Sequence, residues 1–134
     1  MTATDVAAHG WTVWAWMAMG ALMLAQLGVV DVLGLRSGHQ PGSPVPFEPQ
    51  VAHFRATRAL GNTNESIAVF VLLTLFCIGS DAHAGATAAA AWACVGFRVA
   101  HTACYWAGLA LARSLSFAGV LLSLVALLVI GLAT

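Results

Sequence analysis

The chain has 134 residues, of which 60% are hydrophobic and 7% are charged, and its mean hydropathy is +0.88. A soluble domain carries about 25% charged residues, so this composition indicates a membrane protein, and no hydrophilic stretch is long enough to fold as a separate catalytic domain. The formal net charge is zero and lysine is absent, which argues against nucleic acid as a partner.

Four apolar segments predict an all-α fold, a single membrane domain over residues 1–134 with four spanning helices. We expect the spans at about residues 11–35, 58–79, 84–110 and 114–133. All four prolines fall between the first two spans, in RSGHQPGSPVPFEPQ, and they predict a loop because proline interrupts helices. The third span contains ATAAAAWACVG, whose small residues allow neighbouring helices to approach closely in a bilayer.

A polar stretch, RATRALGNTNE at residues 55–65, stands where the second span should begin. The apolar run Ile67–Gly79 that follows has 13 residues, roughly 20 Å of helix, whereas a bilayer core is about 30 Å thick. The helix must therefore extend back through Arg58, Asn62 and Glu65. Polar groups at that depth are costly unless they point into the bundle, where they usually mark a site.

Four spans place both termini on one side of the membrane. The arginines gather at the opposite end, so the positive-inside rule makes that end cytoplasmic and the termini external. A layer of polar side chains then lies in the cytoplasmic third of the bilayer. Its members are Arg58, Asn62, Glu65, Arg98, His101, Thr102, Tyr105 and Arg113.

Within this layer two helices carry matching polar stripes. Arg58, Asn62 and Glu65 have the spacing i, i+4, i+7, and the third span repeats that spacing from Arg98 onward, so each set lies on one face of its helix. We expect the two stripes to face each other, with Glu65 paired to Arg98. The alternative is that these groups only lock the bundle together.

Arg113 is predicted to lie in a short turn and to precede a helix that starts at Ser114, where free backbone N–H groups and the helix dipole favour an anion. The alternative for Arg113 is a topology anchor at the membrane surface. Tyr105 fits an interfacial aromatic ring equally well, and a satisfied buried histidine is the favoured interpretation of His101 over a catalytic base.

The cysteines and histidines do not point to a metal site. Cys77, Cys94 and Cys104 lie in apolar segments without a CxxC spacing, so we expect small buried side chains and no disulfide framework. The five histidines are scattered along the chain and form no HExxH pattern.

Two segments of this chain resemble a known family. RATRALGNTNE resembles the R-x-x-R-A-x-x-N-x-x-E signature of the MAPEG family, the membrane-associated proteins of eicosanoid and glutathione metabolism. FRVAHTACYWAGLALARSLSF is similar to the region of the third and fourth helices in that family's microsomal glutathione transferases and prostaglandin E synthase. The resemblance implies a four-helix subunit in a homotrimer. It also implies glutathione bound between neighbouring subunits near the cytoplasmic face, and a hydrophobic small molecule or lipid as second substrate.

By motif position, the resemblance implies that Arg113 and Ser114 carry the chemistry by stabilising a glutathione thiolate. The other residues that it implies as glutathione contacts are Arg58, Asn62, Glu65, Arg98, His101, Tyr105 and Arg36. This pattern is typical of a glutathione-dependent transferase or peroxidase. The short loops and the lack of a basic C-terminal tail favour a bacterial plasma membrane.

Two positions depart from the family pattern. Gly61 stands where related enzymes often carry a basic residue, and Phe117 stands where many place a tyrosine hydroxyl near the thiol. Both departures favour the alternative, a non-catalytic lipid-binding or assembly protein of the same fold. A small channel or transporter fits less well, because the charges cluster at one depth and form no path across the bilayer.

Overall fold

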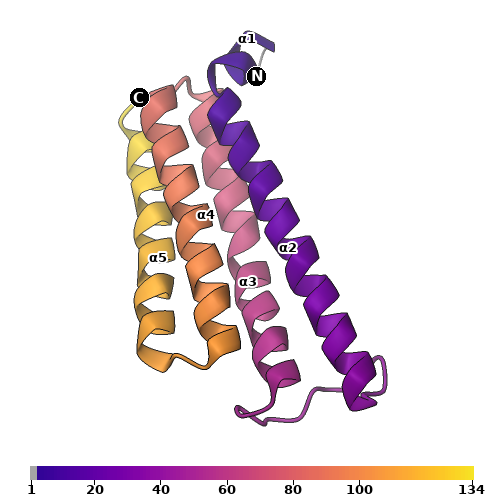
Figure 1. Ribbon diagram of the computed structural model, residues 1–134. Helices are drawn as coiled ribbons and strands as arrows, with labels where there is room; N and C mark the ends of the chain where they lie inside the picture. Colours follow the sequence, from indigo (N-terminus) through magenta and orange to yellow (C-terminus); the bar gives the residue numbers. More distant parts are fainter. Residues whose placement is uncertain (1–2) are drawn as a thin grey trace.

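The computed structural model describes residues 3–134, with side chains from residue 6 on. Every regular element in that range is an α-helix (Figure 1), which confirms the all-α prediction. The helices are α1 (Ala3–Ala8), α2 (Gly10–Ser37), α3 (Ala52–Gly79), α4 (Ala84–Ala107) and α5 (Ala110–Leu132). The sequence predicted four helices, and the short α1 is an additional one.

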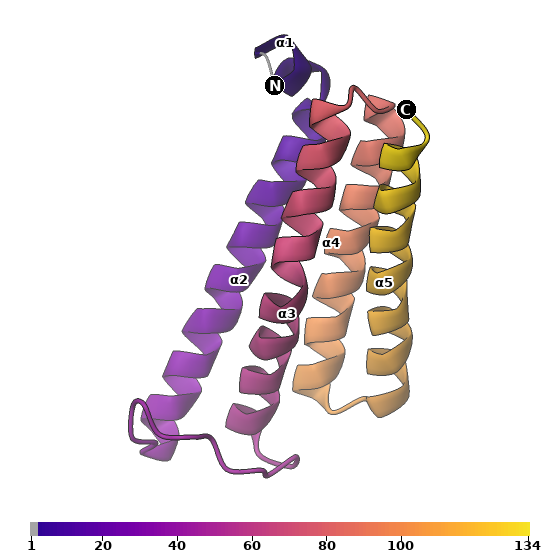
Figure 2. The same ribbon diagram turned by 180° about the vertical axis from the view of Figure 1, so that it is seen from behind.

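The four long helices lie side by side, and the chain runs to and fro along the bundle (Figures 1 and 2). Both termini lie at one end, as predicted. The α2–α3 loop and the α4–α5 turn lie at the opposite end, here called the loop end. In both views α2 leans away from α4 and α5 as it approaches the loop end.

Three of the helices, α2, α3 and α5, are long and apolar enough to cross a membrane, judged by length and composition. The predicted third span corresponds to α4, a helix of 24 residues that lies beside the others. It carries Arg98, His101 and Thr102 within its apolar sequence. All three of these side chains are buried inside the bundle, so α4 presents a mostly apolar surface outward.

Helix boundaries near the loop end differ from the prediction. α3 begins at Ala52, so RATRALGNTNE lies wholly within a helix. α4 ends at Ala107 because Gly108 adopts a left-handed conformation with φ 75°, which glycine tolerates best and which ends the helix. α5 then begins at Ala110 instead of Ser114. The turn between α4 and α5 is therefore shorter than expected.

The proline-rich segment between α2 and α3 is a loop, as predicted, and Arg55 fastens it to the bundle. The Arg55 guanidinium donates to the carbonyl oxygen of Gln50 at 2.8 Å and to that of Pro49 at 3.4 Å. Its Nε donates to the carbonyl of Trp106 in the last turn of α4, at 3.2 Å. Carbonyls at a helix C-terminus lack intrahelical partners and attract a cation, so this contact holds the loop against α4.

Small side chains line the contacts of α4 with its neighbours, which confirms the close packing predicted for this segment. Ala91 and Cys94 are buried, and on α5 a Cβ added to Gly119 would lie 2.5 Å from the ring of Phe97. Because real Cβ atoms do not approach so closely, the helix contact requires a glycine at position 119. Cys77 is also buried and Cys104 is half-buried, and all three cysteines are free thiols.

Candidate functional site

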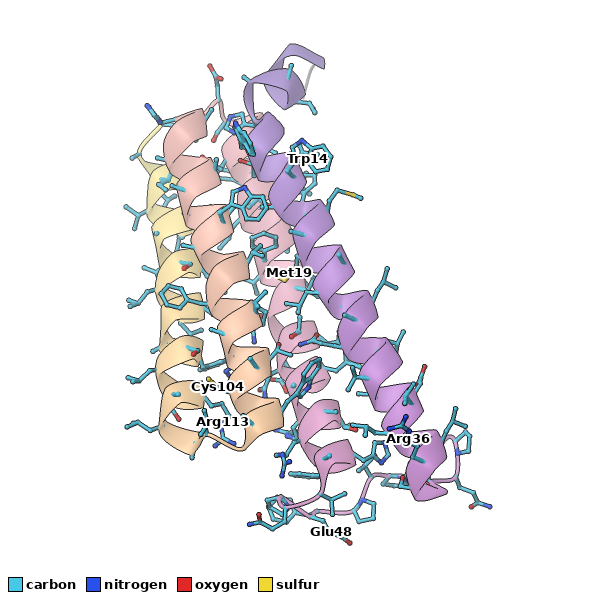
Figure 3. The ribbon with its side chains drawn as sticks, in the orientation of Figure 1. Trp14, Met19, Arg36, Glu48, Cys104 and Arg113 are labelled. Carbon is cyan, nitrogen blue, oxygen red and sulfur yellow. The ribbon has the colours of Figure 1, made fainter. Side chains whose placement is uncertain are left out.

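An open hollow of about 220 Å³ lies between α3, α4 and α5 near the loop end. We call it the Arg113 hollow, and Figure 3 places Arg113 beside the α4–α5 turn. Five residues singled out from the sequence line it, together with Phe117. They are Asn62 on α3, His101 and Tyr105 on α4, and Arg113 and Ser114 on α5.

A stack of rings holds the Arg113 guanidinium at the wall of the hollow. Its Cζ atom lies 4.6 Å from the centroid of the Tyr105 ring, a cation–π contact. The Tyr105 ring meets the His101 ring edge-on, with centroids 5.3 Å apart, and the His101 ring lies 5.7 Å from that of Phe117. No carboxylate is among the residues that line the hollow, so the positive charge is left for a ligand.

His101 links α4 to α5 at the position of Arg113. Its Nδ1 lies 3.0 Å from the backbone oxygen of Arg113, and because a carbonyl only accepts, Nδ1 carries the hydrogen. The neutral ring then has an acceptor at Nε2, which is buried and has no partner among the described residues. His101 is thus a buried histidine with one of its two ring nitrogens bonded, which matches the satisfied histidine that the sequence favoured only in part, and it fixes the backbone that carries Arg113.

The expected anion site at the N-terminus of a helix starting at Ser114 is wrong. Since α5 begins at Ala110, the backbone N–H of Arg113 already donates to the oxygen of Leu109 at 3.0 Å. The Ser114 hydroxyl donates to the oxygen of Ala110 at 3.1 Å. The groups that Arg113 and Ser114 offer to the hollow are therefore the guanidinium and the lone pairs of the hydroxyl oxygen.

Asn62 on α3, like Ser114 on α5, donates a hydrogen bond to its own helix. Its Nδ2 donates to the backbone oxygen of Arg58 at 2.9 Å, one turn earlier in the same helix. The amide oxygen remains as an acceptor on the wall of the hollow. Asn62 thus offers an oxygen to a bound amine or amide, while the opposite wall offers the cation of Arg113.

A second set of polar groups lies deeper between α2, α3 and α4, and we call it the buried polar layer. Gln26 of α2 donates from Nε2 to the hydroxyl oxygens of Thr63 at 3.0 Å and Thr102 at 2.7 Å. Each hydroxyl in turn donates to a backbone oxygen of its own helix. These bonds join three helices through one amide. The layer consists of Gln26, Thr63, Ser66, Arg98 and Thr102.

The predicted pairing of Glu65 with Arg98 is wrong. Arg98 is fully buried and donates from Nη2 to the Ser66 hydroxyl, while its Nε and Nη1 have no partner among the described residues. Glu65 is exposed, as is Arg58. The α3 helix is rotated so that Thr63 and Ser66 face the interior of the bundle and Asn62 faces the Arg113 hollow, while Arg58 and Glu65 point outward.

Three predicted site residues, Arg36, Arg58 and Glu65, are exposed and do not line the Arg113 hollow. Figure 3 shows Arg36 near the end of α2, across α3 from Arg113. Conversely, the sequence interpretation missed Gln26. A single glutamine inside the first apolar segment was the signal for it, since an isolated polar side chain in a membrane helix needs partners within the bundle.

Comparison with known proteins agrees with the motif-based expectation. A sequence model of the MAPEG family matches residues 1–133 of the chain. No curated protein and no solved structure matches the chain.

Proposed function

The chain belongs to the MAPEG family, and on this basis we propose that it is a membrane-bound glutathione-dependent transferase or peroxidase acting on hydrophobic electrophiles or lipid hydroperoxides. It is an integral membrane protein, with three helices that are long and apolar enough to span a bilayer. The observation that supports the activity is the Arg113 guanidinium, stacked on Tyr105 at an open hollow that no carboxylate lines.

The proposed chemistry starts from the glutathione thiol, a weak nucleophile until it loses its proton. A guanidinium beside the sulfur stabilises the thiolate in preference to the thiol, and the Ser114 hydroxyl can turn its hydrogen from Ala110 toward the sulfur. In conjugation, the sulfur forms a bond to the electrophilic carbon, and a leaving group departs with its electron pair.

In peroxide reduction the sulfur attacks the terminal oxygen of the hydroperoxide. The O–O bond breaks, and the alkoxide that leaves takes a proton to become an alcohol. A second glutathione then attacks the resulting sulfenic acid, which gives glutathione disulfide and water.

The remaining predicted contacts match the groups of a tripeptide with one ammonium and two carboxylates. Asn62 and Glu65 lie one turn apart on α3, where an acceptor and a carboxylate suit the amino group. The arginines Arg36 and Arg58 suit the carboxylates, and His101 and Tyr105 hold Arg113 in place. Arg98 is buried in the polar layer, so it would support the glutathione contacts from within the bundle. Phe117 contributes an apolar wall next to the sulfur.

We propose a homotrimer in which a neighbouring subunit completes the site. The Arg113 hollow, at about 220 Å³, is smaller than the roughly 300–1,000 Å³ of ligand pockets. Arg36 lies on the far side of α3 within its own chain, so Arg36 serves a hollow only if that hollow belongs to a neighbouring copy. Glutathione would then lie between two subunits.

The proposed location is a bacterial inner membrane, with four spans that include α4, external termini and a cytoplasmic site. The positive-inside rule supports this orientation because Arg36, Arg55 and Arg113 lie at the loop end. Asp81 and His83 lie between α3 and α4, at the end that holds the termini.

The test is a glutathione titration of the purified trimer, with the ultraviolet absorbance of the thiolate as readout. Wild type should show saturable thiolate formation, and Arg113→Ala should lower conjugation by about 10²-fold or more, as does removing one group that stabilises developing negative charge. Arg113→Lys, which keeps the charge but not the planar guanidinium, should recover part of the lost conjugation activity. Wild-type protein without thiolate or conjugation would contradict the proposal.

The second candidate is a non-catalytic lipid-binding or assembly protein. The buried polar layer favours it, since Gln26 and Arg98 form contacts that join helices, and Phe117 contributes no hydroxyl to the hollow. Calorimetric titration with glutathione separates the two candidates. An absence of saturable binding would support the second.

A further inference from the structure

A hollow of about 470 Å³ lies between the last turns of α2, the α2–α3 loop and the first turns of α3, and we call it the histidine hollow. It shares no lining residue with the Arg113 hollow. Its polar lining consists of Asp31 on α2, His39 in the loop, and His53 and Thr57 on α3. No arginine lines it and the chain has no lysine, so its charge is opposite to that of the Arg113 hollow.

His53 is a buried side chain that faces the histidine hollow without a bonding partner. It is 7% exposed, and neither of its ring nitrogens forms a hydrogen bond within the described residues. A Cβ added to Gly34 would lie 3.3 Å from its Nε2, so the glycine lets the ring lie close against α2. The His39 ring meets it edge-on, with centroids 4.9 Å apart. Because buried polar groups are normally bonded, the free acceptor nitrogen of His53 calls for a hydrogen donor from outside the chain.

The other polar groups of the histidine hollow are also acceptors. The Nε2 of His39 lies 3.1 Å from the backbone oxygen of Ser43, so Nε2 carries the hydrogen and Nδ1 is left as an acceptor. The Thr57 hydroxyl donates to the backbone oxygen of His53 at 2.9 Å, which leaves its lone pairs. Asp31 adds a carboxylate that no lining cation neutralises. A metal ion fits poorly, because no three histidine, cysteine or acidic side chains among the described residues gather closely enough to hold one. A primary ammonium, with three N–H donors and a positive charge, fits this lining.

Asp31 lies at the depth of the lipid headgroups. α2 has 28 residues, roughly 42 Å of helix, which matches the about 40–45 Å of a bilayer with its headgroups. Asp31 precedes the last residue, Ser37, by roughly 9 Å, so its carboxylate lies near the boundary between headgroups and hydrocarbon. Leu24 and Leu27 are exposed and continue the face of Asp31 toward the bilayer centre, with the spacing i, i+3, i+7. Arg36 lies roughly 140° around the helix from Asp31, so the hollow faces away from the subunit that Arg36 is proposed to contact.

We propose that the histidine hollow binds the primary ammonium of a membrane lipid headgroup, as in phosphatidylethanolamine. The Asp31 carboxylate accepts a charge-assisted hydrogen bond from the ammonium, the imidazole of His53 accepts another, and an acyl chain lies along Leu27 and Leu24. The volume of about 470 Å³ lies within the roughly 300–1,000 Å³ of ligand pockets. A choline headgroup carries the same charge but has no N–H, so it leaves these acceptors unbonded. The site is separate from the glutathione chemistry and does not depend on it.

The test is native mass spectrometry of the full-length protein, released from mixed micelles that contain phosphatidylethanolamine and phosphatidylcholine with identical acyl chains. Wild type should retain the ethanolamine lipid about tenfold over the choline lipid, the size of one charge-assisted hydrogen bond. Asp31→Asn should bring this ratio close to one, because the amide has no charge to offer. His53→Phe keeps a ring beside Gly34 but has no nitrogen, and it should lower the ratio about threefold, the size of a neutral hydrogen bond.

The matched control is Glu48→Gln. Glu48 lines a smaller hollow that also contacts His53, but it does not line the histidine hollow, so the ratio should stay at the wild-type value. Equal retention of the two lipids by wild type would overturn the inference, as would a preference that survives Asp31→Asn. Stronger retention of phosphatidylglycerol, which has no ammonium, would also overturn it. Displacement of the ethanolamine lipid by free ethanolamine at equal concentration would assign the hollow to a water-soluble amine and overturn the lipid assignment.

Discussion

The Arg113 hollow and the buried polar layer both include residues of α4, yet Gln26 and Arg98 of the layer are bonded differently from Asn62 and Ser114 of the hollow. In the layer, Thr102 is 2% exposed, and the bonds of Gln26 and Arg98 cross from one helix to another. In the hollow, Asn62 and Ser114 each donate to a backbone oxygen of their own helix and remain accessible.

This difference separates residues that hold the bundle together from residues that are free to bind a ligand. A bond between two helices uses polar groups of both side chains. A side chain that donates to its own helix keeps its oxygen lone pairs for a ligand. Arg113 also offers its guanidinium, which packs on Tyr105 and not on a carboxylate. Changes in the layer should therefore alter stability, and changes in the hollow should alter glutathione chemistry.

The largest effect that tests this separation is expected for Gln26→Leu. The substitution keeps the volume of the side chain but removes the two hydrogen bonds that Gln26 donates to α3 and α4. Hydrogen bonds between membrane helices contribute about 0.6 kcal/mol each and up to about 1.7 kcal/mol, so the free energy of unfolding should fall by about 1–3 kcal/mol. Denaturant unfolding of the purified protein in detergent measures it.

The matched control for Gln26→Leu is Glu65→Gln on exposed α3 surface. It should leave the free energy of unfolding within about 0.5 kcal/mol of wild type, because Glu65 forms no ion pair with Arg98. If Glu65→Gln destabilised the protein more than Gln26→Leu, the description of Glu65 as an unpaired surface residue and of Gln26 as the link between helices would be wrong.

The sequence predicted the parts of the fold that depend on local signals. Apolar runs located the long helices, and the prolines located the loop. Asn62 and Arg113 both lie near the loop end of their predicted spans, so the sequence placed them at the same end of the bundle. The rotation of α3 was not predictable from its own stripe, because it depends on simultaneous packing against α2 and α4. Gln26 contributes to that packing from α2, a different segment of the chain.

The start of α5 was also not predictable from local signals. Its N-cap residue is Leu109, which makes no side-chain capping bond, and the first turn is alanine and leucine. No serine, threonine, aspartate or asparagine stands at the N-cap to mark the start of the helix. The sequence analysis therefore placed the helix start after Arg113, the first polar residue, whereas the helix begins three residues before it. The sequence named all six residues that line the hollow, five as site residues and Phe117 as a departure from the family pattern.

A smaller effect should distinguish two serines of α5 that have the same local bonding. Ser114 and Ser116 each donate to the oxygen four residues earlier, at 3.1 Å and 2.7 Å, but only Ser114 lines the Arg113 hollow. Ser114→Ala should lower the rate of glutathione conjugation about tenfold, the contribution of one hydrogen bond to a charged sulfur. Ser116→Ala should leave the rate unchanged. Equal effects would mean that the hydroxyl acts on the helix and not on the ligand.

The smallest effect is expected where this chain departs from the family pattern, at Gly61. A Cβ added there meets no atom within 4 Å, so α3 accepts a side chain without rearrangement, and replacing glycine inside a helix stabilises it by up to about 1 kcal/mol. Gly61→Arg adds a cation next to Asn62 and should tighten glutathione binding about two- to fivefold, the strength of an exposed ion pair. Gly61→Ala provides the helix stabilisation without the charge. If calorimetry found equal glutathione affinities for the two variants while both unfolded at higher temperature, position 61 would belong with the layer, as a determinant of stability alone.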